Sequence, residues 1–224
     1  MKQLTKSWMI GALLMPLILV AQELRFNPDS TVTTQHQVTI KGAPVKFRVT
    51  TGMQPVWNEK GEVRAGLFFT YYRRTDVPDT VHRPLVFSFN GGPGAGALWM
   101  RLGYTGPHRI KIDEEGFPVQ PYGIEDNPHS LLDVADIVFI EPVNTGYSRP
   151  AKGVPADEFF GVKTDVAYLA KWITTFVTRY NRWVSPKYLV GESYGTTRVS
   201  GLALELQAKH WMYINGVVLV SPTG

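Results

Sequence analysis

The sequence predicts an α/β protein with a mixed, mostly parallel sheet that starts with antiparallel strands. Four short apolar stretches end near positions 89, 140, 191 and 220, and helical patterns follow two of them. Apolar strands that alternate with helices are typical of a parallel sheet covered on both faces. Earlier, residues 37–72 alternate β-branched or aromatic residues with polar ones, with turn residues at Gly42 and at 58–61. This alternation is typical of antiparallel strands.

Each later element has its own pattern. Residues 83–97 predict an apolar strand that runs into a Gly-rich loop, and residues 131–148 predict a second strand with a similar loop. A third strand lies in 186–197, a helix follows at 198–211, and a fourth strand lies in 214–224. Early antiparallel strands leading into such a sheet suit an α/β-hydrolase, whose active site we expect at the carboxyl ends of the strands.

The segment 159–184 predicts a long amphipathic helix. We interpret its apolar face as one that packs against the rest of the protein. The residues that recur at helical spacing on this face are Phe160, Val166, Leu169, Trp172, Ile173, Phe176 and Tyr180.

The first 21 residues differ from the rest of the chain. Lys2 and Lys6 precede an uncharged, apolar run from Trp8 to Ala21. A basic start, a short apolar run and a small final residue predict a secretory signal peptide, removed on export to the periplasm or the medium. The run is shorter than the roughly 20 residues that span a bilayer, and an uncleaved membrane anchor is the alternative. Residues 22–224 are then expected to belong to a single domain without membrane contact.

Composition and charge exclude several classes of function. Apolar residues make up 44% of the chain and charged residues 19%, which suits a packed core. Removing Lys2 and Lys6, with no acid, lowers the formal charge from +4 to +2, and the remaining basic residues are scattered. We therefore expect no nucleic-acid binding. The absence of cysteine excludes a thiol nucleophile and cysteine-based metal sites, and nothing in the sequence implies a metal or an organic cofactor.

The third strand ends in the pentapeptide GESYG, which predicts a nucleophile elbow. In this motif the central serine, here Ser193, sits on a sharp turn between a strand and a helix, and both are predicted here. Gly191 and Gly195 keep the strand and the helix from colliding through their Cβ atoms. The Ser193 hydroxyl would then stand above the sheet, near the positive end of the following helix.

Acyl transfer also requires donors for the oxyanion that develops on the substrate. One donor is the backbone N–H of the residue after the nucleophile, here Tyr194. The second is expected from the loop FNGGPG at 89–94. Gly91 and Gly92 have no side chains, so a substrate can approach the backbone of this loop closely.

Three motifs, FNGGPG, EPVNTGYS and GESYG, in this order and at this spacing, resemble the serine carboxypeptidase family. The likeness covers residues 65–224. It implies the α/β-hydrolase fold and the release of single residues from peptide C-termini, so a peptide with a free C-terminus is the expected substrate. It implies Ser193 as the nucleophile and the amides of Gly92 and Tyr194 as the oxyanion hole.

The resemblance further implies that Asn90 and Glu192 bind the terminal carboxylate of the substrate, beside Gly91. A carboxyl group donates a hydrogen bond to a carboxylate only while it is protonated, so such a site should favour acidic pH. One departure from the family pattern is Tyr104, which stands where many members have an acid. This departure favours an esterase or an acyltransferase on the same fold as an alternative function.

The general base has no clear candidate in this sequence. In an α/β-hydrolase the acid and the histidine follow the serine, and after Ser193 only Glu205 and His210 are available. A helix rises about 1.5 Å per residue, so His210 would lie about 25 Å from Ser193. A base must come within about 3 Å. The four earlier histidines are interpreted as surface or capping residues.

We therefore expect the chain to be the N-terminal half of a catalytic domain, truncated after the strand that follows the nucleophile helix. Family members are about twice this length, and the triad acid and histidine would lie in the other half. A chain without them is expected to be inactive alone. The alternative of another class is a non-catalytic remnant that keeps the peptide-binding groove.

Overall fold

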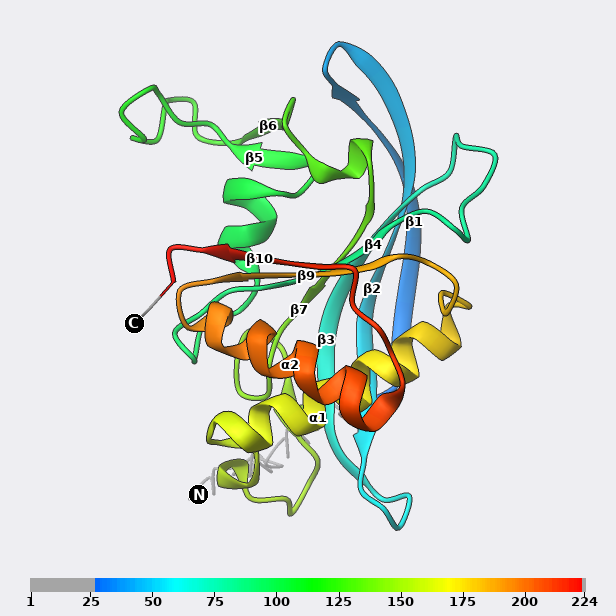
Figure 1. The fold of residues 1–224 in the computed structure, drawn as a ribbon. Helices are drawn as coiled ribbons and strands as arrows, with labels where there is room; N and C mark the ends of the chain where they lie inside the picture. Colours follow the sequence, from blue (N-terminus) through cyan, green and yellow to red (C-terminus); the bar gives the residue numbers. More distant parts are fainter. Residues whose placement is uncertain (1–26, 223–224) are drawn as a thin grey trace, which may run out of the picture.

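The computed structural model describes residues 27–222, so the predicted signal peptide at 1–21 lies outside the described residues and stays a prediction. Figure 1 shows a twisted central sheet, two long helices packed against one of its faces and a small hairpin arm that projects from the body. Within the described range, no helix is long and apolar enough to cross a bilayer.

The elements have the following bounds. The strands of the large sheet are β1 (Ser30–Ile40), β2 (Ala43–Trp57), β3 (Val63–Arg74), β4 (Leu85–Phe89), β7 (Asp136–Ile140), β8 (Arg149–Pro150), β9 (Lys187–Glu192) and β10 (Gly216–Val220). The arm consists of β5 (His108–Ile110) and β6 (Ile124–Asp126). The helices are α1 (Val162–Arg179) and α2 (Tyr194–His210), with short helical turns η1 (Met100–Tyr104), η2 (Leu131–Asp133) and η3 (Ala156–Phe159).

The mixed sheet predicted from the sequence is confirmed. Its order is β1-β2-β3-β7-β4-β9-β10, with β8 paired to β3. The strands from β1 to β3 are antiparallel to their neighbours, whereas β7, β4, β9 and β10 are parallel to one another. The first strand starts at Ser30, earlier than predicted. Its exposed residues pair with β2, but they show no alternation of apolar and polar residues from which the strand could be predicted.

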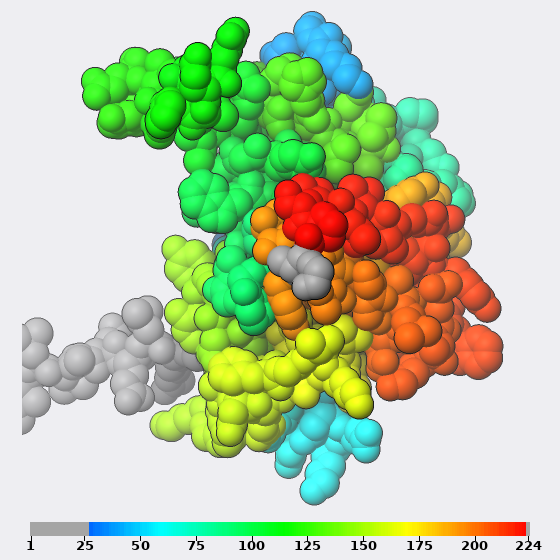
Figure 2. All heavy atoms as spheres, turned by 60° about the vertical axis from the view of Figure 1, so that its left-hand side comes forward, coloured from blue at the N-terminus to red at the C-terminus, as the bar shows by residue number. Residues whose placement is uncertain are grey.

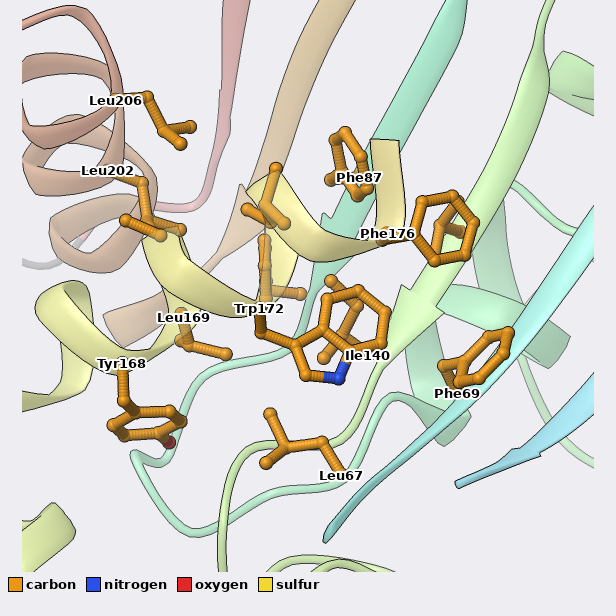
Figure 3. Close-up of a cluster of buried hydrophobic side chains, with 14 of the residues drawn as sticks. Leu67, Phe69, Phe87, Ile140, Tyr168, Leu169, Trp172, Phe176, Leu202 and Leu206 are labelled. Carbon is orange, nitrogen blue, oxygen red and sulfur yellow. The ribbon is translucent and has the colours of Figure 1, made fainter. Parts of the chain in front are cut away.

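The largest core lies between the sheet and the helices. Side chains of α1 point towards β3 and β4 (Figure 3). Trp172 stacks on Phe176 with ring centroids 5.3 Å apart, and Phe69 meets both rings edge-on. The indole N–H of Trp172 donates a hydrogen bond to the Gln54 carbonyl at 3.2 Å, so its one polar group is satisfied. This aromatic cluster fixes α1 on the sheet.

The predicted packing face of the long helix needs one correction. Phe160 lies before α1 and is 59% exposed, whereas Val166 and the predicted residues that follow it pack in the core. Gly161, with φ of 99°, separates Phe160 from the first helical turn and turns it away from that face. The second helix also starts earlier than predicted, at Tyr194, because the elbow passes directly into it.

A buried ion pair lies at the amino-terminal end of the parallel strands, opposite to the end where the active site is expected. Asp136, the first residue of β7, is fully buried and accepts hydrogen bonds from Arg182 at 2.6 Å and from Arg83 at 3.1 Å. Arg182 also donates to the Arg83 carbonyl at 2.7 Å. These contacts compensate the cost of removing the charges from water and close the amino-terminal edge of the sheet.

Replacing Trp172 by Ala should lower the free energy of unfolding by about 3–5 kcal/mol, because the change leaves a cavity among aromatic rings. The matched control is Trp211→Ala, since the Trp211 side chain is 78% exposed. That variant should stay within about 0.5 kcal/mol of the wild type. Urea unfolding measures both values, and similar losses in the two variants would contradict the packing described for α1.

Candidate active site

Ser193 lies on a sharp turn between β9 and α2. Its backbone has φ 55° and ψ −127°, a conformation that costs a residue other than glycine about 1–3 kcal/mol. A Cβ atom on Gly191 would lie 2.1 Å from the carbonyl oxygen of Gly195, so only glycine fits there. The Ser193 N–H donates to the Val220 carbonyl at 3.0 Å, and the Ser193 carbonyl accepts from the Thr196 N–H at 2.9 Å. The chain therefore forms the turn geometry that the motif predicts.

The loop after β4 lies directly against this turn. Because β4 and β9 are parallel, with Phe89 opposite Gly191, their carboxyl ends meet at one edge of the sheet. A Cβ atom on Gly91 would lie 2.7 Å from the Tyr194 nitrogen and 2.8 Å from the Ser193 Cβ. Gly92 follows with φ of 106°. The structure thus brings the Gly-rich loop and the elbow together, and their roles in an oxyanion hole remain a prediction.

Asn90 and Glu192, the residues predicted to bind a carboxylate, are in contact. The Asn90 side chain is almost fully buried; its Nδ2 donates to Glu192 Oε2 at 3.2 Å, and its Oδ1 accepts the Met100 N–H at 3.0 Å. Asn90 is therefore held from two sides, and it in turn orients the Glu192 carboxyl group. This arrangement is compatible with the binding of a terminal carboxylate, which stays a prediction.

The segment after the Gly-rich loop presents aromatic side chains to solvent. Trp99 is 63% exposed and Tyr104 is 57% exposed, at the two ends of η1. The Tyr104 carbonyl accepts a hydrogen bond from Asn127 at 3.0 Å, which ties η1 to the segment after β6. Figure 2 views this side of the molecule, with the β5–β6 arm projecting beyond the body.

The five histidines contact residues other than Ser193. Among residues 27–222, no hydrogen bond joins a histidine to Ser193. Four imidazole rings have these neighbours: His36 stacks on Phe47 at 5.7 Å, His82 contacts Asp79 at 2.6 Å, His108 contacts Asp126 at 3.7 Å and His210 contacts Thr174 at 3.2 Å. His129 donates its backbone N–H to Asn127 at 3.0 Å. The sequence argument against His210 as the base is consistent with this contact.

A cavity of about 280 Å³ lies beside the elbow. Its wall includes Tyr194, Pro93, the loop at 142–145 and the residues that precede α1. Two charged side chains at this wall, Asp165 and Arg198, form a buried ion pair at 2.7 Å. Sequence analysis did not single them out. Helical periodicity could have indicated that both side chains are buried. Asp165 stands one turn before Leu169, and Arg198 stands one turn before Leu202, on the buried faces of their helices.

Glu141 supports the loop that follows β7. Its Oε2 accepts the Tyr147 N–H at 2.7 Å, and a Cβ atom on Gly146 would overlap this carboxylate. Burial raises the pKa of Glu141 above its ordinary value of 4.5, although the Tyr147 hydrogen bond and the nearby Arg101 act in the opposite direction. The loop is therefore folded around a carboxyl group that is costly to ionise.

Replacing Gly91 by Ala should lower the free energy of unfolding by about 1–3 kcal/mol, because the new Cβ atom would collide with the backbone of the elbow. Gly94→Ala in the same loop is the control, since a Cβ atom there has open space within 4 Å and an unstrained φ. It should change the stability by less than about 0.5 kcal/mol. Equal effects of the two substitutions in urea unfolding would argue against the close approach of Gly91.

Replacing Glu141 by Gln should remove a pH dependence of stability. The folded protein binds the Glu141 proton more tightly than the unfolded chain, so the wild type loses stability as pH rises from 4.5 through the raised folded pKa. Gln keeps an oxygen that accepts the Tyr147 N–H and does not titrate.

The measurement is urea unfolding of both proteins at several pH values. We expect the stability of the wild type relative to Glu141→Gln to fall across that interval. The same substitution at the exposed Glu114 tests whether the loss of any one negative charge has this effect. Parallel pH profiles of wild type and Glu141→Gln would show that Glu141 is not responsible.

Comparisons with known proteins agree with this geometry. A family model described as serine carboxypeptidase matches residues 40–219. Serine carboxypeptidase-like 36 of Arabidopsis thaliana is 30% identical over 166 residues, which cover 71% of this chain and 32% of that protein. Serine carboxypeptidase-like 31 of the same plant is 26% identical over 203 residues, 85% of this chain and 38% of that protein. The chain thus spans between 32% and 38% of the length of these relatives.

A solved structure shows the same fold. Kex1(delta)p, described as a prohormone-processing carboxypeptidase from Saccharomyces cerevisiae, superposes with a TM-score of 0.63 at 19% identity. The match covers 77% of this chain and 38% of that one. The family model over residues 40–219 confirms, at the level of the family, the resemblance seen in the three sequence motifs. The chain belongs to the serine carboxypeptidase family and has the α/β-hydrolase fold.

Proposed function

We propose that this chain carries the nucleophile and the oxyanion hole of a serine carboxypeptidase, which releases residues from the C-termini of peptides. The observation that carries this proposal is the meeting of two loops at one sheet edge. There Gly91 packs against Ser193 and Tyr194, and Asn90 contacts Glu192. The residues proposed as nucleophile, as oxyanion donors and as carboxylate-binding pair thus all belong to two short segments that are in contact, which supports the proposal.

In the proposed reaction the Ser193 Oγ attacks the carbonyl carbon of the last peptide bond. A general base takes the hydroxyl proton as the new C–O bond forms. The carbonyl oxygen becomes an oxyanion, which accepts hydrogen bonds from the amides of Gly92 and Tyr194. Collapse breaks the C–N bond, and the leaving amine takes the proton from the base. Water then hydrolyses the acyl-enzyme and restores Ser193.

The base and the acid that orients it are placed outside residues 27–222 in this proposal. The resemblance implies a histidine as the base, and the complete site would require that residue within about 3 Å of the Ser193 hydroxyl. The substrate would lie with its terminal carboxylate against Asn90 and Glu192, beside Gly91. While the Glu192 carboxyl group is protonated, two side chains that donate hydrogen bonds to a carboxylate would favour a free C-terminus over a blocked one.

A second candidate function is the cleavage or transfer of esters on the same machinery. The observation that favours it is Tyr104, an exposed aromatic residue on η1 where many family members have an acid. A third candidate, of a different class, is a protein that binds peptides without turnover.

The test of the proposed nucleophile uses a fluorophosphonate probe on the full-length protein. Wild type should be labelled and Ser193→Ala should not, and the variant should lose at least about a thousandfold in kcat. Ser200→Ala on α2 is the control, because its hydroxyl donates to the Thr196 carbonyl within the helix. Absence of labelling in the wild type would refute a catalytic role for Ser193.

The choice of substrate separates the candidates. Matched peptides with a free carboxylate and with an amide at the C-terminus, and a blocked ester, are compared through kcat/KM. Preference for the free carboxylate supports the carboxypeptidase. Preference for the blocked ester supports an esterase or acyltransferase. Peptide binding without any turnover supports the non-catalytic candidate.

A further inference from the structure

Arg198, on the first turns of α2, is among the most buried side chains of the molecule, with 1% of its surface exposed. Its Nη1 donates to the Asn90 carbonyl at 2.8 Å, and its Nη2 lies 3.5 Å from the Pro93 carbonyl. One guanidinium group thus contacts the main chain on both sides of Gly91 and Gly92. These two glycines are the part of the loop that the proposed reaction uses.

The same side chain also contacts the other half of the proposed oxyanion hole. The centre of the guanidinium group lies 5.2 Å from the centroid of the Tyr194 ring and 5.8 Å from that of Phe89. A guanidinium group at this distance from an aromatic face is attracted by it. Arg198 therefore links Tyr194, whose amide is one proposed donor, with the loop that supplies the other.

Asp165 on α1 holds Arg198 in this position. Its Oδ2 accepts from Arg198 Nε at 2.7 Å, and its Oδ1 accepts from the Tyr168 hydroxyl at 3.1 Å. Burial, together with the Asp165 charge, raises the pKa of Tyr168, so this hydroxyl stays a donor. The Tyr168 oxygen in turn accepts the Val143 N–H at 3.2 Å. The network thus ends in the loop that follows β7.

We propose that the Asp165–Arg198 pair positions the two oxyanion donors relative to Ser193; this inference rests on the proposed function. A buried ion pair contributes little to stability, because apolar residues of similar size are often as stabilising. Apolar residues cannot, however, donate hydrogen bonds to two carbonyl groups of one loop, and this is what Arg198 does here. Arg198 and Asp165 are positioning residues, since neither is placed against the substrate.

The test compares Arg198→Lys with Arg182→Lys in the full-length protein. Lysine keeps the positive charge but loses the planar fork that contacts several acceptors together. Arg182 is a matched control, because it is equally buried and paired with an aspartate, at the opposite end of the sheet. Arg198→Lys should lower kcat about tenfold to a hundredfold, because small displacements of catalytic groups have effects of this size. KM should change less than about twofold, and Arg182→Lys should keep the kcat of the wild type.

A second readout does not depend on turnover. Amide hydrogen exchange of Gly91, Gly92, Gly94 and Ala95, and of Tyr194, should accelerate in Arg198→Lys more than in Arg182→Lys, once both are corrected for global stability. If the wild type does not react with fluorophosphonate, the proposed function fails, and amide exchange alone decides whether Arg198 orders the loop. Should Arg198→Lys fail to fold, Asp165→Asn takes its place, with changes in the same direction. Equal kcat loss at Arg182, or equal exchange in both variants, overturns the inference.

Discussion

The parallel pairing of β4 with β9 is the constraint on which the candidate site depends. It places Phe89 opposite Gly191, so the two strands end at the same level of the sheet. The loop after β4 and the elbow after β9 therefore meet as soon as the strands pair. They meet so closely that a side chain at position 91 would enter the backbone of the elbow. The residues of this chain that are proposed for binding or chemistry, from Asn90 to Gly92 and from Glu192 to Tyr194, lie within a few residues of these two strand ends.

The helical layer supports this edge in two ways. Away from the site, α1 contributes aromatic side chains such as Trp172 to the core, where burial of apolar surface is the main stabilising effect. Near the site, the same helix contributes Asp165, which contacts Arg198 of α2. Close to the loops, each helix thus contributes one partner of a buried ion pair in addition to its apolar contacts.

Much of the fold and the core of the site could be predicted, because they depend on local patterns. Apolar strands, turn glycines and the GESYG motif specify the parallel strands and the elbow without long-range information. Phe160 was assigned to the wrong surface, since periodicity does not reveal that Gly161 interrupts the helix. The β5–β6 arm has no strong strand pattern. Arg198 was missed because its partners come from distant segments, and a single charged residue on a helix does not indicate them.

The hydrogen bond from the Ser193 N–H to the Val220 carbonyl has a consequence for the dynamics of the site. Val220 is the last residue of β10, and Val217, Val218 and Leu219 of this strand are between 40% and 49% exposed. The turn that carries Ser193 is thus fastened to the end of β10 as well as to β9 and α2, so a displacement of this strand end would also move the Ser193 backbone.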